Sequence, residues 1–207
     1  MAMTEATLVA RLAAAAAGIR ETVAMVPTVA LSLGGGSDAG RYFARHAAVD
    51  LDPLLGPGGG ETRGELVFGE LGGIPTIILP GRPGGSAPLS ESTLPVRIAK
   101  RLGAGVLVVA GRAEALNPAW EKSRLMVIVD HVNLLGRNPL VGPNDDQLGP
   151  RFPDMTAAYD PNLRRLAEES AHGRGIQLVR GVYVGRAGAS PTEAANAADD
   201  GTANRVG

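Results

Sequence analysis

The chain has 207 residues, of which 44% are hydrophobic and 20% are charged, and its formal net charge at pH 7 is -1. This length suits a single hydrophobic core, and the balanced charge excludes the strongly basic surface of a nucleic-acid-binding protein. Because cysteine is absent, disulfides and cysteine-based zinc sites are excluded, and no group of His, Asp and Glu has metal-ligand spacing. We therefore expect a cytoplasmic protein without metal, nucleic-acid or membrane partners.

The first predicted element is a helix over residues 4–25. Large apolar side chains recur there at helical spacing: Leu8, Leu12, Ile19 and Val23. Its apolar stretch is interrupted by Arg11 and is too short to cross a bilayer. A signal peptide is the less favoured interpretation of the alanine-rich run at 13–17.

Strand signals follow in the next part of the chain. Residues 28–33 form a short apolar run that ends at three consecutive glycines, which is typical of a buried strand leading into a tight loop. Residues 65–71 and 74–80 flank Gly72 and Gly73, and this spacing predicts a hairpin whose turn needs positive φ.

Helices and strands then alternate towards the C-terminus. The pattern of residues 89–102 predicts one amphipathic helix. Its apolar face consists of Leu94, Ile98 and Leu102. The basic residues Arg97, Lys100 and Arg101 lie largely off that face. Residues 105–110 and 125–129 read as strands covered on both faces. Asp160 and Pro161 predict the start of a helix over 161–171, and residues 176–184 predict a last strand.

This alternation predicts an α/β layered domain with a mixed, mainly parallel central sheet, helices on both faces and one antiparallel hairpin. We expect the domain to cover residues 1–186. The remaining 187–207 are small and polar and predict a flexible tail. Ligands bind such sheets beyond the carboxyl ends of the strands, so the loops after Leu33, Pro80, Ala110 and Val184 are the expected sites of chemistry.

Five stretches together carry a family resemblance over roughly residues 27–188. They read GELVFGELGGIPTIILPGR at 64–82, TLPVRIAKRLGAGVLVVA at 93–110, ALNP at 115–118, DHVNLLGRNPLVGPNDDQLGPRFPDMTAAYD at 130–160 and GVYVGRAG at 181–188. In these stretches the chain resembles the trimeric purine nucleoside phosphorylases and the related methylthioadenosine phosphorylases. The family continues into further strands and helices, so we expect a diverged, C-terminally truncated member whose three-layer nucleoside phosphorylase-like sheet is incomplete.

The resemblance implies a reversible reaction, in which a purine nucleoside and inorganic phosphate give free purine and ribose 1-phosphate. No cofactor is implied, because phosphate serves as the co-substrate. The implied assembly is a homotrimer, or a complex with a paralogue. The chemistry needs an anion cradle, a ribose clamp and hydrogen bonds to a purine that gains negative charge as it leaves.

The resemblance places phosphate-binding residues in three loops. In the first, the family's Gly-Ser-Gly aligns with Gly34, Gly35 and Gly36, so backbone donors of Gly35 remain and Ser37 would serve after a change of register. In the second, Arg82 matches a phosphate-binding arginine, with a surface arginine as the alternative. In the third, Arg112 either supplies replacement positive charge or is a surface residue paired with Glu114.

Two residues correspond to the nucleoside side of the site. Phe152 matches an aromatic residue that reaches a neighbouring subunit's site, and it would pack on a ribose or fill an interface, the interface being favoured. Glu193 lies one position after the family's base-binding glutamate, so it contacts the base only if the loop slips. No catalytic residue is assigned, and His131 is interpreted as a core or interface histidine.

Two other interpretations of the sequence stay open. A non-catalytic homologue would keep the fold and bind a small ligand or assemble with an intact paralogue. A truncated, non-functional product is equally compatible with the tail. The altered loops at Gly35, Arg112 and Glu193 give these alternatives their weight.

Overall fold

A computed structural model describes residues 5–34, 42–55, 64–80, 89–120, 124–141 and 144–187. Backbone contacts group the chain into two compact units. The first unit is Met1–Arg112 with Pro139–Phe152, and the second is Ala113–Asn138 with Pro153–Gly207. The predicted domain boundary at residue 186 stays a prediction, because most of the expected tail lies outside the described residues.

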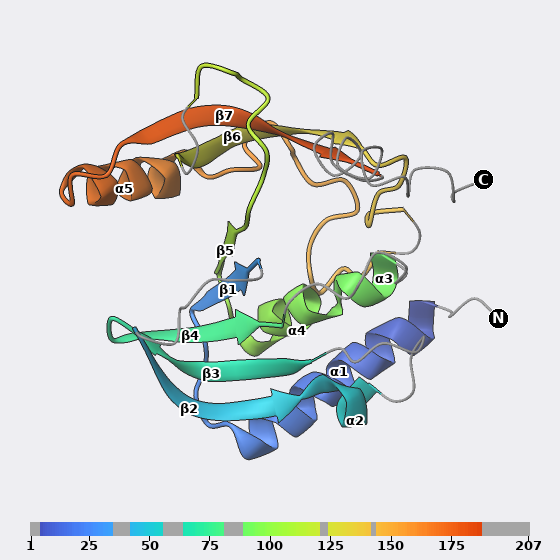
Figure 1. Cartoon of the computed structure of the whole chain (residues 1–207). Coiled ribbons are helices and arrows are strands. Elements are labelled where there is room, and N and C mark those ends of the chain that lie inside the picture. Colours follow the sequence, from blue (N-terminus) through green and yellow to red (C-terminus); the bar gives the residue numbers. More distant parts are fainter. Residues whose placement is uncertain are drawn as a thin grey trace, which may run out of the picture. The chain divides into compact units, whose positions relative to one another are not determined.

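The first unit holds most of the regular structure (Figure 1). Its elements, in chain order, are α1 (Glu5–Thr22), β1 (Val29–Leu33), β2 (Phe43–Asp50), α2 (Leu51–Leu55), β3 (Glu65–Leu71), β4 (Ile74–Leu79), α3 (Leu89–Ser92), α4 (Leu94–Leu102) and β5 (Val106–Ala110). The second unit contains β6 (Leu125–Leu134), α5 (Pro161–His172) and β7 (Leu178–Arg186).

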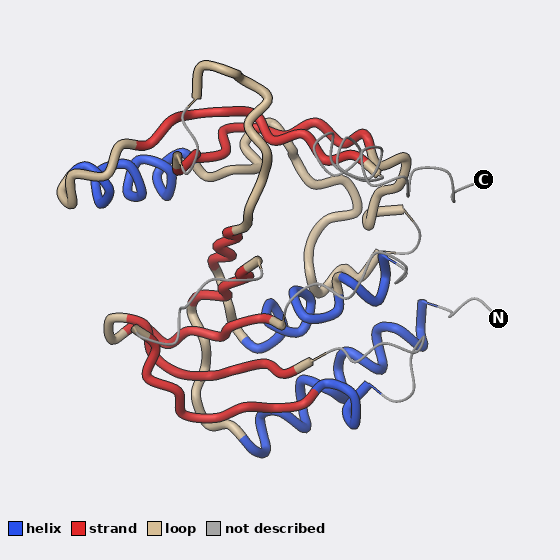
Figure 2. The backbone as a smooth tube through the Cα atoms, viewed as in Figure 1, coloured by secondary structure: helices blue, strands red, loops and turns tan. Residues whose placement is uncertain are grey.

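The sheet of the first unit has five strands in the order β2-β3-β4-β1-β5. Strand β1 is parallel to both β4 and β5, whereas β2–β3 and β3–β4 are antiparallel. In the second unit β6 and β7 form a parallel pair. The predicted α/β class with a mixed, mainly parallel sheet is thus confirmed. Figure 2 shows where the helices and strands lie along the backbone.

The core of the first unit lies where α1, α2 and α4 pack on the sheet (Figure 1). One row of the sheet carries Ala30, Ile77 and Phe68 side by side, and all three are buried. The helices complete the cluster with these buried apolar residues: Leu12, Ala15, Ala16 and Ile19 of α1, Leu51 and Leu55 of α2, and Leu94, Ile98, Ala99 and Leu102 of α4. The apolar face predicted for residues 89–102 is therefore confirmed.

The predicted hairpin is present between β3 and β4. Leu71 lies opposite Ile74, which leaves a two-residue turn made of Gly72 and Gly73. Their φ angles are 59° and 78°, in the left-handed region that disfavours residues with a Cβ. Two consecutive residues of this kind give the turn that matches the twist of a hairpin.

Two elements were not predicted, and one predicted helix is divided. Strand β2 and helix α2 escaped the sequence patterns because FARHAAVD alternates poorly and LDPLL is short and contains a proline. A register shift between Arg45 and Ala47 interrupts the period further. The expected helix over 89–102 separates into α3 and α4 at Thr93, where Pro95 in the first turn of α4 lacks a backbone N–H.

The strands predicted to be covered on both faces are more exposed than expected. Strand β5 lies at the edge of the sheet, and its Leu107, Val108 and Val109 are all exposed. In β6, Leu125, Val132 and Leu134 are exposed as well. A continuous apolar run does not distinguish a central strand from an edge strand, because the pattern records apolar residues and not the neighbours that cover them.

The start of α5 is fixed by a capping interaction. The Asp160 carboxylate accepts hydrogen bonds from the backbone N–H groups of Asn162 and Leu163 at 2.8 and 2.9 Å, and Pro161 occupies the first turn. The cap satisfies two backbone donors that the helix itself leaves unpaired. The predicted boundary at Asp160 is confirmed.

An ion pair connects α5 to β7. The Arg180 guanidinium donates two hydrogen bonds to the Glu168 carboxylate, at 2.6 and 2.7 Å. The hydrogen bond from Arg180 lowers the pKa of Glu168 below the ordinary glutamate value of 4.5, and the same contact raises the pKa of Arg180. This two-pronged geometry orders α5 beside the strand pair.

None of the described helices is long and apolar enough to cross a membrane.

Replacing Asp160 with alanine is expected to lower the free energy of unfolding by about 1 kcal/mol, because two N–H groups lose their acceptor. The Asp160→Asn variant is the matched control, since asparagine caps as well as aspartate and only the charge is removed. Urea titration followed by far-UV circular dichroism measures both. An equal loss in the two variants would show that charge, and not capping, matters at this position.

Removing the Glu168 charge with Glu168→Gln is expected to lower the melting temperature at pH 7. Since the folded pKa of Glu168 is depressed, its contribution is present above the unfolded pKa and is lost as the pH falls through the folded value. The difference between wild type and variant should therefore shrink as the pH falls below the ordinary glutamate range, and it should disappear once Glu168 is protonated in the folded protein. Because the pair is exposed, added salt should reduce the difference at pH 7.

Candidate functional site

The parallel strands β1, β4 and β5 have their C-terminal ends side by side, so the three loops that follow them begin next to one another. Ser32 lies beside Leu79, and Leu33 lies beside Ala110. All three strands run in the same direction, so their carboxyl ends form a common rim, and the chain leaves this rim at Gly34, Pro80 and Gly111. Three of the four loops predicted to carry chemistry therefore begin next to one another. The fourth, after Val184, belongs to the second unit.

The backbones of β1 and β5 come very close at this rim. The Gly34 N–H donates a 2.7 Å hydrogen bond to the carbonyl of Ala110, the last residue of β5, which extends the ladder one residue beyond the end of β1. A Cβ on Gly34 would lie 3.0 Å from the Gly111 Cα and 3.4 Å from the Ala110 oxygen. Position 34 thus needs glycine for close approach, and not for a positive φ.

Only some of the predicted site residues can be placed. Gly35, Ser37, Arg82 and Glu193 lie outside the described residues. Arg112 follows β5 by two positions, so it stands at the rim, and its side chain is exposed. Arginine at this place puts positive charge beside the ends of two parallel strands, and its guanidinium is a donor suited to an anion.

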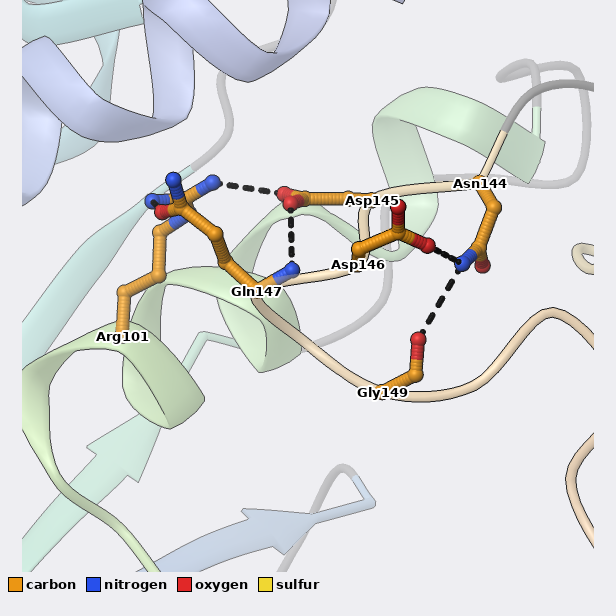
Figure 3. Close-up of polar contacts among 6 residues, drawn as sticks. All are labelled: Arg101, Asn144, Asp145, Asp146, Gln147 and Gly149. Carbon is orange, nitrogen blue, oxygen red and sulfur yellow. Dashed lines mark hydrogen bonds and ion pairs between the residues drawn. The ribbon is translucent and has the colours of Figure 1, made fainter.

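A polar turn at residues 144–149 is closed by several hydrogen bonds (Figure 3). Asn144 donates from its side chain to Asp146 at 2.7 Å and to the Gly149 carbonyl at 3.1 Å. Asp145 accepts from the Gln147 N–H at 3.2 Å, and its carbonyl accepts from the Leu148 N–H at 2.9 Å. These bonds close the turn on itself.

Arg101 of α4 fastens this turn to the helix. Its guanidinium donates to the Asp145 carboxylate at 2.6 Å and to the Gln147 side-chain oxygen at 2.7 Å (Figure 3). The side chains of Arg101 and Asp145 are 11% and 5% exposed. Arg20 of α1 donates to the Arg101 carbonyl, so α1, α4 and the turn are joined through one residue.

The burial of the Arg101 side chain was not predicted from the sequence. Helical periodicity placed Arg101 with Arg97 and Lys100 largely off the apolar face, which left its surroundings open. Its partner lies 44 positions away in sequence, which periodicity cannot detect. Within the described residues, the buried Arg101 Nε has no hydrogen-bond acceptor.

Phe152 ends the same segment and is strongly exposed. Its ring is 85% exposed, and the Arg151 guanidinium lies over it at 5.0 Å from the ring centroid. Arg151 also donates to the Leu140 carbonyl at 3.2 Å, which closes the base of the loop that contains the polar turn. A large aromatic ring supported by a cation on its face is preorganised for contact with another molecule.

In the described part of the second unit, His131 and Tyr159 form an aromatic pair. Tyr159 Oη lies 3.3 Å from His131 Nδ1, and the two rings meet edge to face. Burial, followed by the charges of Asp130 and Tyr183, raises the pKa of Tyr159. His131 is exposed and is therefore not the core histidine expected from the sequence, while its possible place in an interface stays a prediction.

Among the described residues, no group of three or more His, Asp or Glu side chains is arranged to hold a metal ion.

Comparison with known proteins agrees with this arrangement. A family model described as the phosphorylase superfamily matches residues 25–206. The chain belongs to the phosphorylase superfamily. Because this phosphorylase match includes both units, the resemblance inferred from residues 27–188 is confirmed.

Named relatives of this phosphorylase family member are purine nucleoside phosphorylases. Purine nucleoside phosphorylase 1 of Geobacillus stearothermophilus is 43% identical over 129 residues, which is 60% of this chain and 46% of the relative. The enzyme of Rattus norvegicus is 43% identical over 134 residues, with the same two coverages. The chain thus spans about half the length of the curated relatives it matches.

Comparison with solved structures extends the similarity to most of this chain. The purine nucleoside phosphorylase of Schistosoma mansoni in complex with acetate has a TM-score of 0.77 and 28% identity, covering 92% of this chain and 75% of that one. Isoform 2 from the same organism, in complex with cytosine and ribose-1-phosphate, has a TM-score of 0.78 and 29% identity, covering 92% and 72%. The nucleoside phosphorylase-like fold is therefore confirmed.

Replacing Gly34 with alanine is expected to lower the free energy of unfolding by about 1 kcal/mol, because its Cβ must push the ends of β1 and β5 apart. Gly111→Ala is the matched control, since a Cβ there meets nothing within 4 Å and should change the free energy by less than about 0.5 kcal/mol. Chemical denaturation measures both variants. Equal stability of the two would contradict the close approach at the rim.

Proposed function

We propose that this chain is a purine nucleoside phosphorylase that converts a purine nucleoside and inorganic phosphate into free purine and ribose 1-phosphate. The observation that carries the proposal is the common rim of β1, β4 and β5 in a member of the phosphorylase superfamily. No cofactor is required, because phosphate acts as the co-substrate. The proposed location is the cytoplasm.

We propose that phosphate binds at this rim. The loops that follow Gly34, Pro80 and Gly111 begin at adjacent strand ends, which would bring their backbone N–H groups near one anion. We assign Gly35, Ser37, Arg82 and Arg112 to this anion, with Arg112 already standing at the rim. Phosphate held here would stabilise the positive charge that develops on the sugar as the glycosidic bond breaks.

Solved relatives support purine nucleosides as the substrate class. Similar solved structures include the Schistosoma mansoni enzyme in complex with inosine, its isoform 2 with cytosine and ribose-1-phosphate, and a schistosoma enzyme with hypoxanthine. We propose that this chain binds the same kinds of molecule, with Phe152 against the sugar and Glu193 near the base. We further propose a homotrimer, in which the exposed Phe152 ring of one subunit serves the site of the next.

A non-catalytic homologue is the alternative function. It is favoured by the contrast between a well-formed polar turn at 144–149 and the altered residues of the anion loops, where Gly35 takes the place of the family's serine. Such a protein would bind a nucleoside or assemble with an intact paralogue without turning substrate over.

Release of hypoxanthine from inosine, followed with and without phosphate, separates the two functions. Phosphate-dependent turnover, with methylthioadenosine as a second substrate, supports the phosphorylase. A soluble protein that binds inosine without releasing hypoxanthine supports the non-catalytic homologue. Size-exclusion chromatography with light scattering, run on the same preparation, tests the trimer.

Replacing Arg112 with alanine is expected to raise the KM for phosphate about tenfold and to leave the KM for inosine unchanged, because a charge-assisted contact to the anion is removed. Arg45→Ala removes the same side chain from β2, at the opposite edge of the sheet, and should change neither value. Initial rates over a phosphate titration measure both. An unchanged phosphate KM in Arg112→Ala would remove Arg112 from the site.

A further inference from the structure

The contact between Arg101 and the polar turn costs more than a surface ion pair. Both partners are almost completely buried, and the Arg101 Nε has no acceptor among the described residues. Desolvation of two charges offsets most of their attraction, and an unpaired buried donor adds to that cost. The ion pair between Arg101 and Asp145 therefore contributes little to stability, and we looked for another role.

The geometry of the Arg101 contacts indicates a role in holding the 144–149 turn. Arg101 donates in two directions, to the carboxylate of Asp145 and to the side chain of Gln147, so it fixes both the position and the orientation of the turn. Leu148 adds an apolar contact with the core of the first unit. A turn held by a fork of donors and by one partly buried side chain has little freedom to rotate.

The turn is also directly connected to Phe152. Only Pro150 and Arg151 separate Gly149 from the ring, and proline restricts the backbone φ at the first of these positions. Arg151 then ties the segment to the Leu140 carbonyl and lies over the ring. A displacement of the turn would therefore move the exposed ring.

We propose that Arg101 is a positioning residue that sets the place of Phe152 through Asp145 and the 144–149 turn. The inference rests on the proposed function, because it assumes that Phe152 contacts the nucleoside. Arg101 itself touches no substrate. Its role is to keep an exposed ring from sampling many positions, which lowers the ordering cost when the nucleoside binds.

The test compares Arg101→Met with Lys100→Met, its matched control on the same helix. Lys100 is exposed and forms no ion pair in the described part of the chain, so its variant removes the same charge without touching the turn. Arg101→Met is expected to raise the KM for inosine about tenfold, with kcat within about twofold of wild type and an unchanged KM for phosphate. Lys100→Met should resemble wild type in all three values.

The Phe152→Ala variant tests whether Arg101 affects the KM for inosine through Phe152. It should raise the inosine KM as Arg101→Met does, and the double variant should be no worse than Phe152→Ala alone, because both changes remove the same contact. Hydrogen exchange in Arg101→Met should be faster at the 144–149 turn and unchanged in β3 and β4. Asp145→Asn provides the same comparison if Arg101→Met does not fold.

Each outcome decides the inference. A wild type that releases no hypoxanthine refutes the proposed function and the positioning role with it. An active wild type with an unchanged inosine KM in Arg101→Met refutes the positioning role alone. A lower kcat at unchanged KM shows a loss of folded enzyme and refutes it too, as do additive effects of the Arg101 and Phe152 substitutions.

Discussion

The candidate site depends on one constraint, which is that β1, β4 and β5 run in the same direction as hydrogen-bonded neighbours. Antiparallel strands would send successive loops to opposite edges, whereas these three strands send their loops to one rim. The close approach of Gly34 to Gly111 follows from the same pairing, since the hydrogen bond from Gly34 to Ala110 continues the ladder one residue past β1. The buried row of Ala30, Ile77 and Phe68 holds the strands in that register, because a shift by one residue would turn these side chains away from the helices.

Apolar packing and polar contacts have different tasks in this chain. The apolar cluster stabilises the first unit by burying leucine, isoleucine and phenylalanine side chains, each contributing roughly 1.5–3 kcal/mol relative to an exposed one. The contact between Arg101 and Asp145 lies beside this cluster. It fixes the orientation of the 144–149 turn more than it stabilises the fold. A hydrophobic contact would tolerate sliding of the turn, but a forked donor facing a carboxylate does not.

Much of the fold follows from local patterns, because periodicity, glycine turns and caps act over a few residues. The hairpin at Gly72 and Gly73, the apolar face of α4 and the cap at Asp160 were all predicted for this reason. Strand β2 was missed because FARHAAVD alternates poorly, and the exposure of β5 was missed because burial depends on neighbours that are distant in sequence. The candidate site divides in the same way. Arg112 was predicted from the family resemblance of its loop and stays a prediction, whereas the role proposed for Arg101 depends on a partner 44 residues away.

The exposed edge of β5 has a consequence for handling this protein. Among the described strands only β1 pairs with it, and the sequence VLVVA carries no charge and no proline that would discourage another strand from adding there. A second molecule that docks backbone to backbone along this edge would gain both hydrogen bonds and apolar contact. Aggregation should therefore grow steeply with protein concentration, and one lysine placed in the middle of that sequence is the smallest change that opposes it.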